Sequence, residues 1–217
     1  MPNAPTKFKI CGITRLEDAE RAVDLGAWAL GLILWPHSPR RCRMDAAAEI
    51  SAAYRRRAEI VGVFVNPTLD HLARMAEDLG LTMLQLHGEE GPVFCGEAAR
   101  RTGCKVIKAA RVRSGADIQA LSSFHTDFHL LDSYLAGLRG GTGETFAWDL
   151  ARGHRGQPVI LSGGLTPDNV GGAIAAVRPF AVDVASGVEA EPGIKDPARL
   201  EAFASAVAES AATLSAS

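Results

Sequence analysis

Short apolar segments recur along the chain, separated by stretches in which apolar residues follow helical spacing. Most segments are continuously apolar rather than alternating, which is typical of parallel strands covered on both faces. Strands that alternate with helices predict a parallel sheet. The predicted strands are Phe8–Ile13, Ala29–Trp35, Ile60–Asn66, Met83–His87, Val106–Val112, Phe128–Asp132, Val159–Ser162 and Ala181–Ser186.

Several helices are predicted from their first residues. The run Thr14-Arg15-Leu16-Glu17 has the form of a capping box directly after the first strand. Thr166-Pro167 and Asp196-Pro197 each place a capping residue before a proline at the first helical position. Helices are therefore expected after the first, seventh and eighth strands.

The order of the elements predicts the fold class. Strand–helix units repeated through 217 residues predict an α/β protein with a single-domain (βα)8 TIM barrel over residues 1–217. An open, doubly wound parallel sheet is the alternative. The first strand is not followed by G-x-G-x-x-G, which argues against a dinucleotide-binding version of that sheet.

The net charge and the spacing of the cysteines indicate which partners and ligands the protein is expected to lack. Lys plus Arg is 23 and Asp plus Glu is 25, giving a net charge of −2, which argues against a nucleic-acid partner. The four cysteines show no C-x-x-C or zinc-type spacing, so neither a disulfide framework nor a metal site is expected.

The apolar segments also bear on localisation. The most apolar stretch, Gly26–Trp35, is shorter than the roughly 20 residues of a membrane span. Met1 to Lys7 lacks the apolar core of a signal peptide. We therefore expect a soluble cytoplasmic protein with no membrane partner.

In a barrel, chemistry is expected where the strands end. Ser162-Gly163-Gly164 and Ser186-Gly187 follow the last two predicted strands, where barrels typically bind phosphate. Glycine lets backbone N–H groups approach an anion closely. The alternative is a pair of tight turns without a ligand. A further glycine-rich run, Gly140-Gly141-Thr142-Gly143, is long for a connection and is expected to form a cover over the site.

Cys11 and Asp132 are the candidate acid–base pair. Cys11 ends the first strand, and Lys9 shares its face, where an ammonium would favour the thiolate. Asp132 ends an apolar strand, where a carboxylate is costly unless exposed, paired or functional. A base and an acid across one substrate suit a proton-shifting isomerisation. The alternative for Cys11 is a small buried apolar residue.

Other polar residues near strand ends have two interpretations each. Arg40 is either an anchor for a substrate anion or a surface arginine. His87 is either a substrate contact or a core histidine. Lys9 and Asp183 are expected to form an ion pair inside the barrel, and Lys108 is expected to pair with an unidentified group.

The residues described above make the chain resemble the phosphoribosylanthranilate isomerase family of tryptophan biosynthesis over nearly its whole length. Eight motifs carry the resemblance, in this order along the chain: Lys9–Thr14, Pro36–Arg40, Val61–Asn66, Gln85–Gly88, Leu130–Asp132, Gly140–Gly143, Leu161–Val170 and Asp183–Glu189.

The resemblance implies a barrel enzyme without cofactor that performs an Amadori rearrangement, the third step from chorismate to tryptophan. The substrate would be N-(5-phosphoribosyl)anthranilate and the product its 1-deoxyribulose 5-phosphate isomer. Cys11 would be the general base, Asp132 the general acid, and Arg40 the anchor of the anthranilate. The substrate-binding residues would be Arg40, His87, Gly141, Gly143, Gly163, Gly164, Ser186 and Gly187. The only partner implied is this small phosphorylated substrate, with a monomeric or homodimeric protein.

One loop departs from the family pattern, and three other functions compete. Glu144 and Ala147 stand where the family commonly has lysine and aspartate. An indole-forming synthase would need lysines at early strand ends, where this chain has Asn66 and Trp35. A sugar-phosphate epimerase would need a metal cluster. A non-catalytic phosphate-binding barrel would not need both Cys11 and Asp132.

Overall fold

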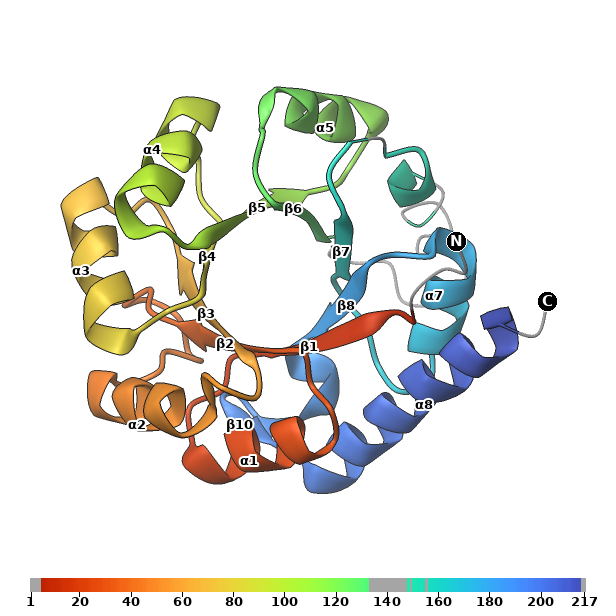
Figure 1. Cartoon of the computed structure of the whole chain (residues 1–217). Helices are drawn as coiled ribbons and strands as arrows, with labels where there is room; N and C mark the ends of the chain where they lie inside the picture. The colour runs from red at the N-terminus through yellow and green to blue at the C-terminus, as the bar shows by residue number, and fades with distance from the viewer. Residues whose placement is uncertain (1–4, 133–147, 149, 155, 216–217) are drawn as a thin grey trace.

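The computed structural model describes residues 5–132, 148, 150–154 and 156–215. These residues form a closed barrel of parallel strands in the order β1 to β8, with helices around the outside (Figure 1). The predicted barrel is therefore confirmed, and the open sheet is excluded.

The strands lie where the apolar segments predicted them, and several end one or two residues earlier. The residues after these ends turn into the loops that carry the predicted chemistry. The barrel strands are β1 (Lys7–Cys11), β2 (Ala29–Ile33), β3 (Glu59–Phe64), β4 (Met83–Leu86), β5 (Lys105–Arg111), β6 (Phe128–Asp132), β7 (Val159–Ser162) and β8 (Ala181–Val184).

Helices or short helical turns follow the strands on the outer face. They are α1 (Leu16–Asp24), α2 (Met44–Tyr54), α3 (Leu69–Leu79), α4 (Pro92–Thr102), α5 (Gly115–Ala120), η1 (Leu121–Ser123), α7 (Val170–Val177), η2 (Ser186–Val188) and α8 (Pro197–Ser215). Within the described residues, no helix is long and apolar enough to cross a membrane.

Two of the predicted helix starts are wrong. Helix α1 begins at Leu16 with Arg15 as its N-cap residue and without a side-chain cap, and the Thr14 hydroxyl donates to the carbonyl of Gly193, 2.5 Å away. Helix α7 begins at Val170, after a turn in which the Asn169 side chain accepts from the Thr166 N–H. The third start is confirmed, since Asp196 accepts from the N–H groups of Ala198 and Arg199.

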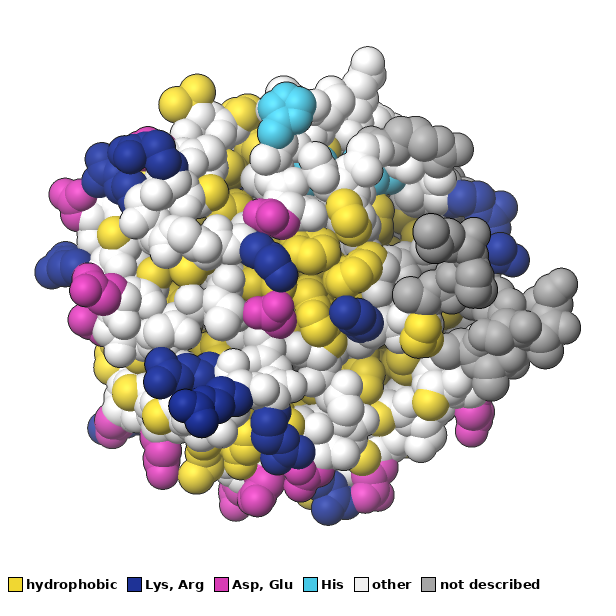
Figure 2. Space-filling view, in the orientation of Figure 1, with side chains coloured by type: hydrophobic (Ala, Val, Ile, Leu, Met, Phe, Trp, Pro, Cys, Tyr) yellow, Lys and Arg dark blue, Asp and Glu magenta, His cyan; other side chains and the backbone are white. Residues whose placement is uncertain are grey.

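Side chains alternate between the barrel interior and the helical layer. The interior cluster contains Ala29, Val61, Met83, Ile107, Ala109, Phe128, Leu130, Ile160 and Ala181. Trp28, Phe128 and Phe180 pack ring to ring, with centroids 5.0–5.6 Å apart, and the Lys7 ammonium lies over two of these rings. At the barrel end that Figure 2 shows, hydrophobic side chains gather in the middle and charged side chains surround them.

A small hairpin between β8 and α8 was not predicted. Its strands, β9 (Glu189–Glu191) and β10 (Ile194–Lys195), pair antiparallel and form a two-stranded sheet of their own. The Pro192-Gly193 turn that joins them is a dipeptide of the kind that marks turns.

Two buried ion pairs stabilise the barrel. The Lys9 ammonium lies 2.8 Å from Asp183 Oδ1 across the β1–β8 register, so the predicted pair is confirmed. Lys108, for which the sequence gave no partner, pairs with Glu90 at 2.8 Å.

The Glu90 carboxylate also joins two loops. Its oxygens accept from the N–H of Asn66 at 2.7 Å and from the N–H of Gly88 at 2.9 Å. Lys108 donates in addition to the Gly88 carbonyl at 2.6 Å. One buried carboxylate therefore holds the ends of β3 and β4 together.

Replacing Glu90 by alanine is expected to lower the free energy of unfolding by about 3–5 kcal/mol, because Lys108 would stay buried without its counter-charge. Chemical denaturation measures this loss. The neighbouring Glu89 is exposed, so Glu89→Ala is the matched control and should change the stability by less than about 0.5 kcal/mol. Equal losses in both variants would contradict the assigned role.

Candidate active site

One cavity at the carboxyl ends of the strands gathers most of the predicted site residues. It measures about 340 Å³ and is lined by Cys11, Arg40, His87, Asp132, Gly163, Gly164 and Ser186, together with Ile33, Val63 and Gln85. The predicted residues Gly141 and Gly143, like Glu144 and Ala147, lie outside the described residues.

The Cys11 thiol lies against the Lys9 ammonium, as the shared strand face predicted. A Cβ atom at Gly31 of β2 would stand 2.9 Å from Cys11 Sγ and 3.0 Å from Lys9 Nζ. Gly31 is the register neighbour of Cys11, so the missing side chain leaves room for both groups. The thiol therefore has a cation at its side and the cavity before it.

The net pKa shift of Cys11 is opposite to the one expected from its neighbour. Burial raises the pKa of the thiol, and this outweighs the lowering by Lys9 and Lys195, so the net pKa lies above its ordinary value. Burial also lowers the pKa of Lys9, but Asp183 and Cys11 more than compensate and the net pKa is raised. Lys9 therefore keeps its positive charge beside the thiol.

Asp132 ends β6 and lines the same cavity as Cys11. Its Oδ2 lies 3.8 Å from His87 Nε2, and the His87 Nδ1 lies 3.3 Å from Gln85 Nε2. The Asp132 carbonyl accepts from the Val112 N–H at 2.9 Å, which fixes the strand end. The structure thus brings the predicted acid and the predicted histidine together.

The loops after β7 and β8 form a glycine-rich wall. Gly163 and Gly164 both have positive φ, +94° and +65°, a conformation that other residues rarely adopt. Gly187 does not line the cavity, but a Cβ there would stand 1.9 Å from the Leu165 carbonyl oxygen. Only glycine fits between these loops, so the two turns are packed backbone to backbone.

Asp183 connects this wall to the Cys11 side. Its Oδ1 accepts from Lys9, and its Oδ2 accepts from the Ser162 hydroxyl at 3.1 Å. The carboxylate therefore links β1, β7 and β8 at the level of the cavity floor.

Arg40 reaches the cavity from the loop after β2, and a carboxylate lies behind it. Its Nε lies 2.9 Å from both Glu189 oxygens, and its Nη2 lies 2.8 Å from Oε2. Glu189 also lies 3.0 Å from Lys195 Nζ.

Sequence reasoning missed Glu189 and Lys195 as functional residues. Both belong to the unpredicted hairpin, six residues apart and separated by Pro192-Gly193. A hairpin assigned from that turn would have placed their side chains near the strand ends.

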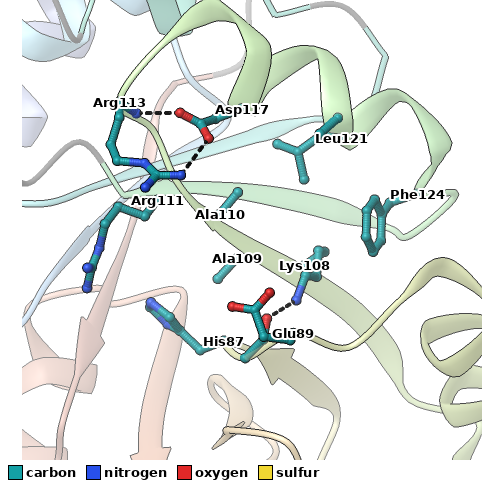
Figure 3. A pocket seen from close by; sticks show the side chains of 12 residues that line it. His87, Glu89, Lys108, Ala109, Ala110, Arg111, Arg113, Asp117, Leu121 and Phe124 are labelled. Carbon is teal, nitrogen blue, oxygen red and sulfur yellow. Dashed lines mark hydrogen bonds and ion pairs between the residues drawn. The ribbon is translucent and has the colours of Figure 1, made fainter.

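Figure 3 shows a second cavity, of about 420 Å³, beyond His87 and between β5 and α5. Two of its cations have partners within its own wall: Arg113 lies 3.1 Å from Asp117, and Lys108 donates to the Gly88 carbonyl. Cys11, Asp132 and the glycine turns line the first cavity, which is therefore the candidate active site.

The residues that the structure describes do not provide a set of side chains that could bind a metal ion. Among those residues, no group of three or more His, Cys, Asp or Glu side chains is arranged to hold a metal ion. The described site therefore offers a thiol, carboxylates and cations as its chemical groups.

Comparison with known proteins identifies the family to which the chain belongs. The family model described as N-(5'-phosphoribosyl)anthranilate (PRA) isomerase matches residues 8–206. An N-(5'-phosphoribosyl)anthranilate isomerase of Citrifermentans bemidjiense is 49% identical over 196 residues, covering 90% of this chain and 93% of that protein.

Solved structures give the same result. The phosphoribosyl anthranilate isomerase of Thermotoga maritima is 41% identical, with a TM-score of 0.84 over 94% of this chain and 99% of that one. A phosphoribosyl anthranilate isomerase in complex with reduced 1-(o-carboxyphenylamino)-1-deoxyribulose 5-phosphate is 38% identical, with a TM-score of 0.81 over 94% and 99%.

Proposed function

Because the chain belongs to the N-(5'-phosphoribosyl)anthranilate isomerase family, an isomerase family of tryptophan biosynthesis, we propose that Cys11 and Asp132 perform its acid–base chemistry. The reaction is the Amadori rearrangement of N-(5'-phosphoribosyl)anthranilate to 1-(o-carboxyphenylamino)-1-deoxyribulose 5-phosphate. The observation that carries the assignment is that both residues line one cavity with the glycine turns.

The first step opens the ribose ring. Asp132, in its protonated form, gives a proton to the ring oxygen, and the nitrogen lone pair forms the C=N bond of a Schiff base as the C–O bond breaks. His87, whose Nε2 lies 3.8 Å from Asp132 Oδ2, would orient the carboxyl or a ribose hydroxyl.

The second step moves a proton from C2. The Cys11 thiolate removes the proton, and the electrons pass through C1 to the nitrogen, giving an enolamine that tautomerises to the ketone. Lys9 beside the sulfur stabilises the thiolate while it forms. A proton-transfer group in position contributes typically about 10²–10⁴-fold to the rate.

The remaining cavity residues would hold the two ends of the substrate. Gly163, Gly164 and Ser186 would bind the phosphate through backbone N–H groups. Arg40 would pair with the anthranilate carboxylate. The family structure with a bound phosphorylated product analogue supports a phosphorylated substrate in this barrel.

Turnover of freshly generated phosphoribosylanthranilate, followed by loss of its fluorescence, tests the proposed function. We expect the wild type to convert it without added metal or cofactor. An inactive wild type that still binds the reduced product analogue would point to another phosphosugar reaction.

The pH profile of kcat/KM is expected to be bell-shaped: it falls at acid pH, where both groups are protonated, keeps its plateau through neutral pH, and falls on the alkaline side only above about pH 8.5, the ordinary range of a thiol. In the reactive form Cys11 is a thiolate and Asp132 is a carboxylic acid, so the two residues together hold one proton. Burial raises the pKa of Cys11, so the pair keeps this proton to higher pH. Measurement of kcat/KM from acid to alkaline pH checks this, and a decline that begins at neutral pH would contradict it.

A further inference from the structure

Arg40 is held from behind by a carboxylate that faces away from solvent. The Arg40 side chain is 26% exposed and lines the cavity, whereas the Glu189 side chain is 4% exposed. Nε and Nη2 of the guanidinium are directed to Glu189. The Nε and Nη2 edge of the guanidinium therefore contacts Glu189, and Nη1 is left for other acceptors.

Glu189 is fixed in turn by two further donors. The Lys195 ammonium, which is 0% exposed, lies 3.0 Å from Oε1, and the Gly193 N–H donates to the same oxygen at 3.2 Å. Burial raises the pKa of the Glu189 carboxyl, but hydrogen bonds from Arg40 and the charge of Lys195 outweigh it, so the net pKa is lowered. The carboxylate is thus ionised and is held by two cations and a backbone N–H.

The same hairpin is attached to the strand that carries the thiol. Lys195 Nζ donates to the Cys11 carbonyl at 2.7 Å and to the Ala185 carbonyl at 3.2 Å. The Lys195 N–H donates to Asp18 of α1 at 3.2 Å. The hairpin therefore places Arg40 at a fixed position relative to the ends of β1 and β8.

We propose that Glu189 is a positioning residue that holds Arg40 ready for the substrate carboxylate, with Lys195 fixing Glu189 relative to the Cys11 end of β1. A free arginine side chain loses rotamer freedom when it binds an anion, and an arginine ordered in advance does not. The inference rests on the proposed function, since it concerns how that substrate is bound.

The charges of the cluster fit one carboxylate. Arg40, Glu189 and Lys195 together carry one net positive charge when all three are ionised. A single carboxylate of the substrate neutralises it. Without Glu189, Arg40 and Lys195 would repel each other and Arg40 would leave its position at the wall.

A double-mutant cycle tests the proposal with four proteins: wild type, Glu189→Gln, Arg40→Met and the double variant. We expect Glu189→Gln to raise KM for phosphoribosylanthranilate about tenfold or more and to change kcat by less than about threefold, because Arg40 contacts substrate and transition state alike. In the Arg40→Met background the same substitution should raise KM by less than about twofold. Glu191→Gln, at an exposed glutamate of the same strand, is the matched control.

Three outcomes overturn the inference. One is a fall in kcat without a rise in KM in Glu189→Gln. Another is an equal rise in KM in both backgrounds, which would mean that Glu189 acts independently of Arg40. The third is an unchanged KM in Arg40→Met although the wild type turns over, which removes the arginine from carboxylate binding. A wild type without turnover instead shows that the proposed function is wrong, and the inference fails with it.

Thermal unfolding of each variant separates positioning from folding. If Glu189→Gln does not fold, Glu189→Asp takes its place, because it keeps the charge and withdraws the carboxylate by one methylene. An unchanged KM in folded Glu189→Asp would also overturn the proposal.

Discussion

Replacing Cys11 by serine is expected to lower kcat by about 10²–10⁴-fold and to leave KM close to the wild-type value. A hydroxyl in the same position is a far weaker acid than a thiol, so the base that takes the C2 proton is lost. The side chain remains small, and the Lys9–Asp183 pair beneath it is unchanged. Steady-state turnover of phosphoribosylanthranilate measures the effect.

Cys95→Ser is the matched control for this variant. Cys95 is also buried, but it lies on α4 in the layer outside the barrel. We expect its kcat to remain within about threefold of wild type, because the site is untouched. A Cys11→Ser enzyme with kcat within about tenfold of wild type would remove Cys11 from the role of base.

Replacing Asp132 by asparagine is expected to lower kcat by a similar factor, about 10²–10⁴-fold. The amide has nearly the same shape and still fits beside His87, but it has no acidic proton for the ring oxygen. Binding of the reduced product analogue should be nearly unchanged, since only the proton donor is lost. Turnover and equilibrium binding together distinguish this result from a collapsed site.

Asp127→Asn is the control on the same chain segment. Asp127 precedes the other end of β6, is exposed, and accepts from the Val106 N–H, which an asparagine oxygen can also do. The Cys11→Ser/Asp132→Asn double variant should be little slower than the slower of the two single variants, because each substitution slows a different step and the slower step sets kcat. Losses that multiply fully would show that both residues act in one and the same rate-limiting step.

The barrel and the position of its site follow from local pattern. Most strands are largely apolar because they are covered on both faces, and this pattern can be recognised without knowing the neighbouring strands. Cys11 and Asp132 were identifiable because they stand at strand ends, which a closed barrel brings to one rim. The Lys9–Asp183 pair was identifiable because the first and last strands of a barrel are adjacent.

The misassigned helix start at Thr14 shows where local pattern fails. The capping box is predicted from neighbouring residues alone, because it concerns a hydroxyl and the backbone N–H groups that follow it. The Thr14 hydroxyl instead lies beside Gly193, 179 residues along the chain, and donates to its carbonyl, so a tertiary contact sets its position. A local rule cannot anticipate such a contact.

The chain by itself determined the fold, the strand ends, the two glycine turns and the residue types available for acid–base chemistry, because these depend on periodicity and on what each residue can do. Only the tertiary structure decided how those groups are tuned. Burial, which reverses the expected pKa shift of Cys11, is a property of the packed barrel. Arg40 and Lys108, the partners of Glu189 and Glu90, lie far from them along the chain. Such long-range contacts produce no periodic pattern in a sequence.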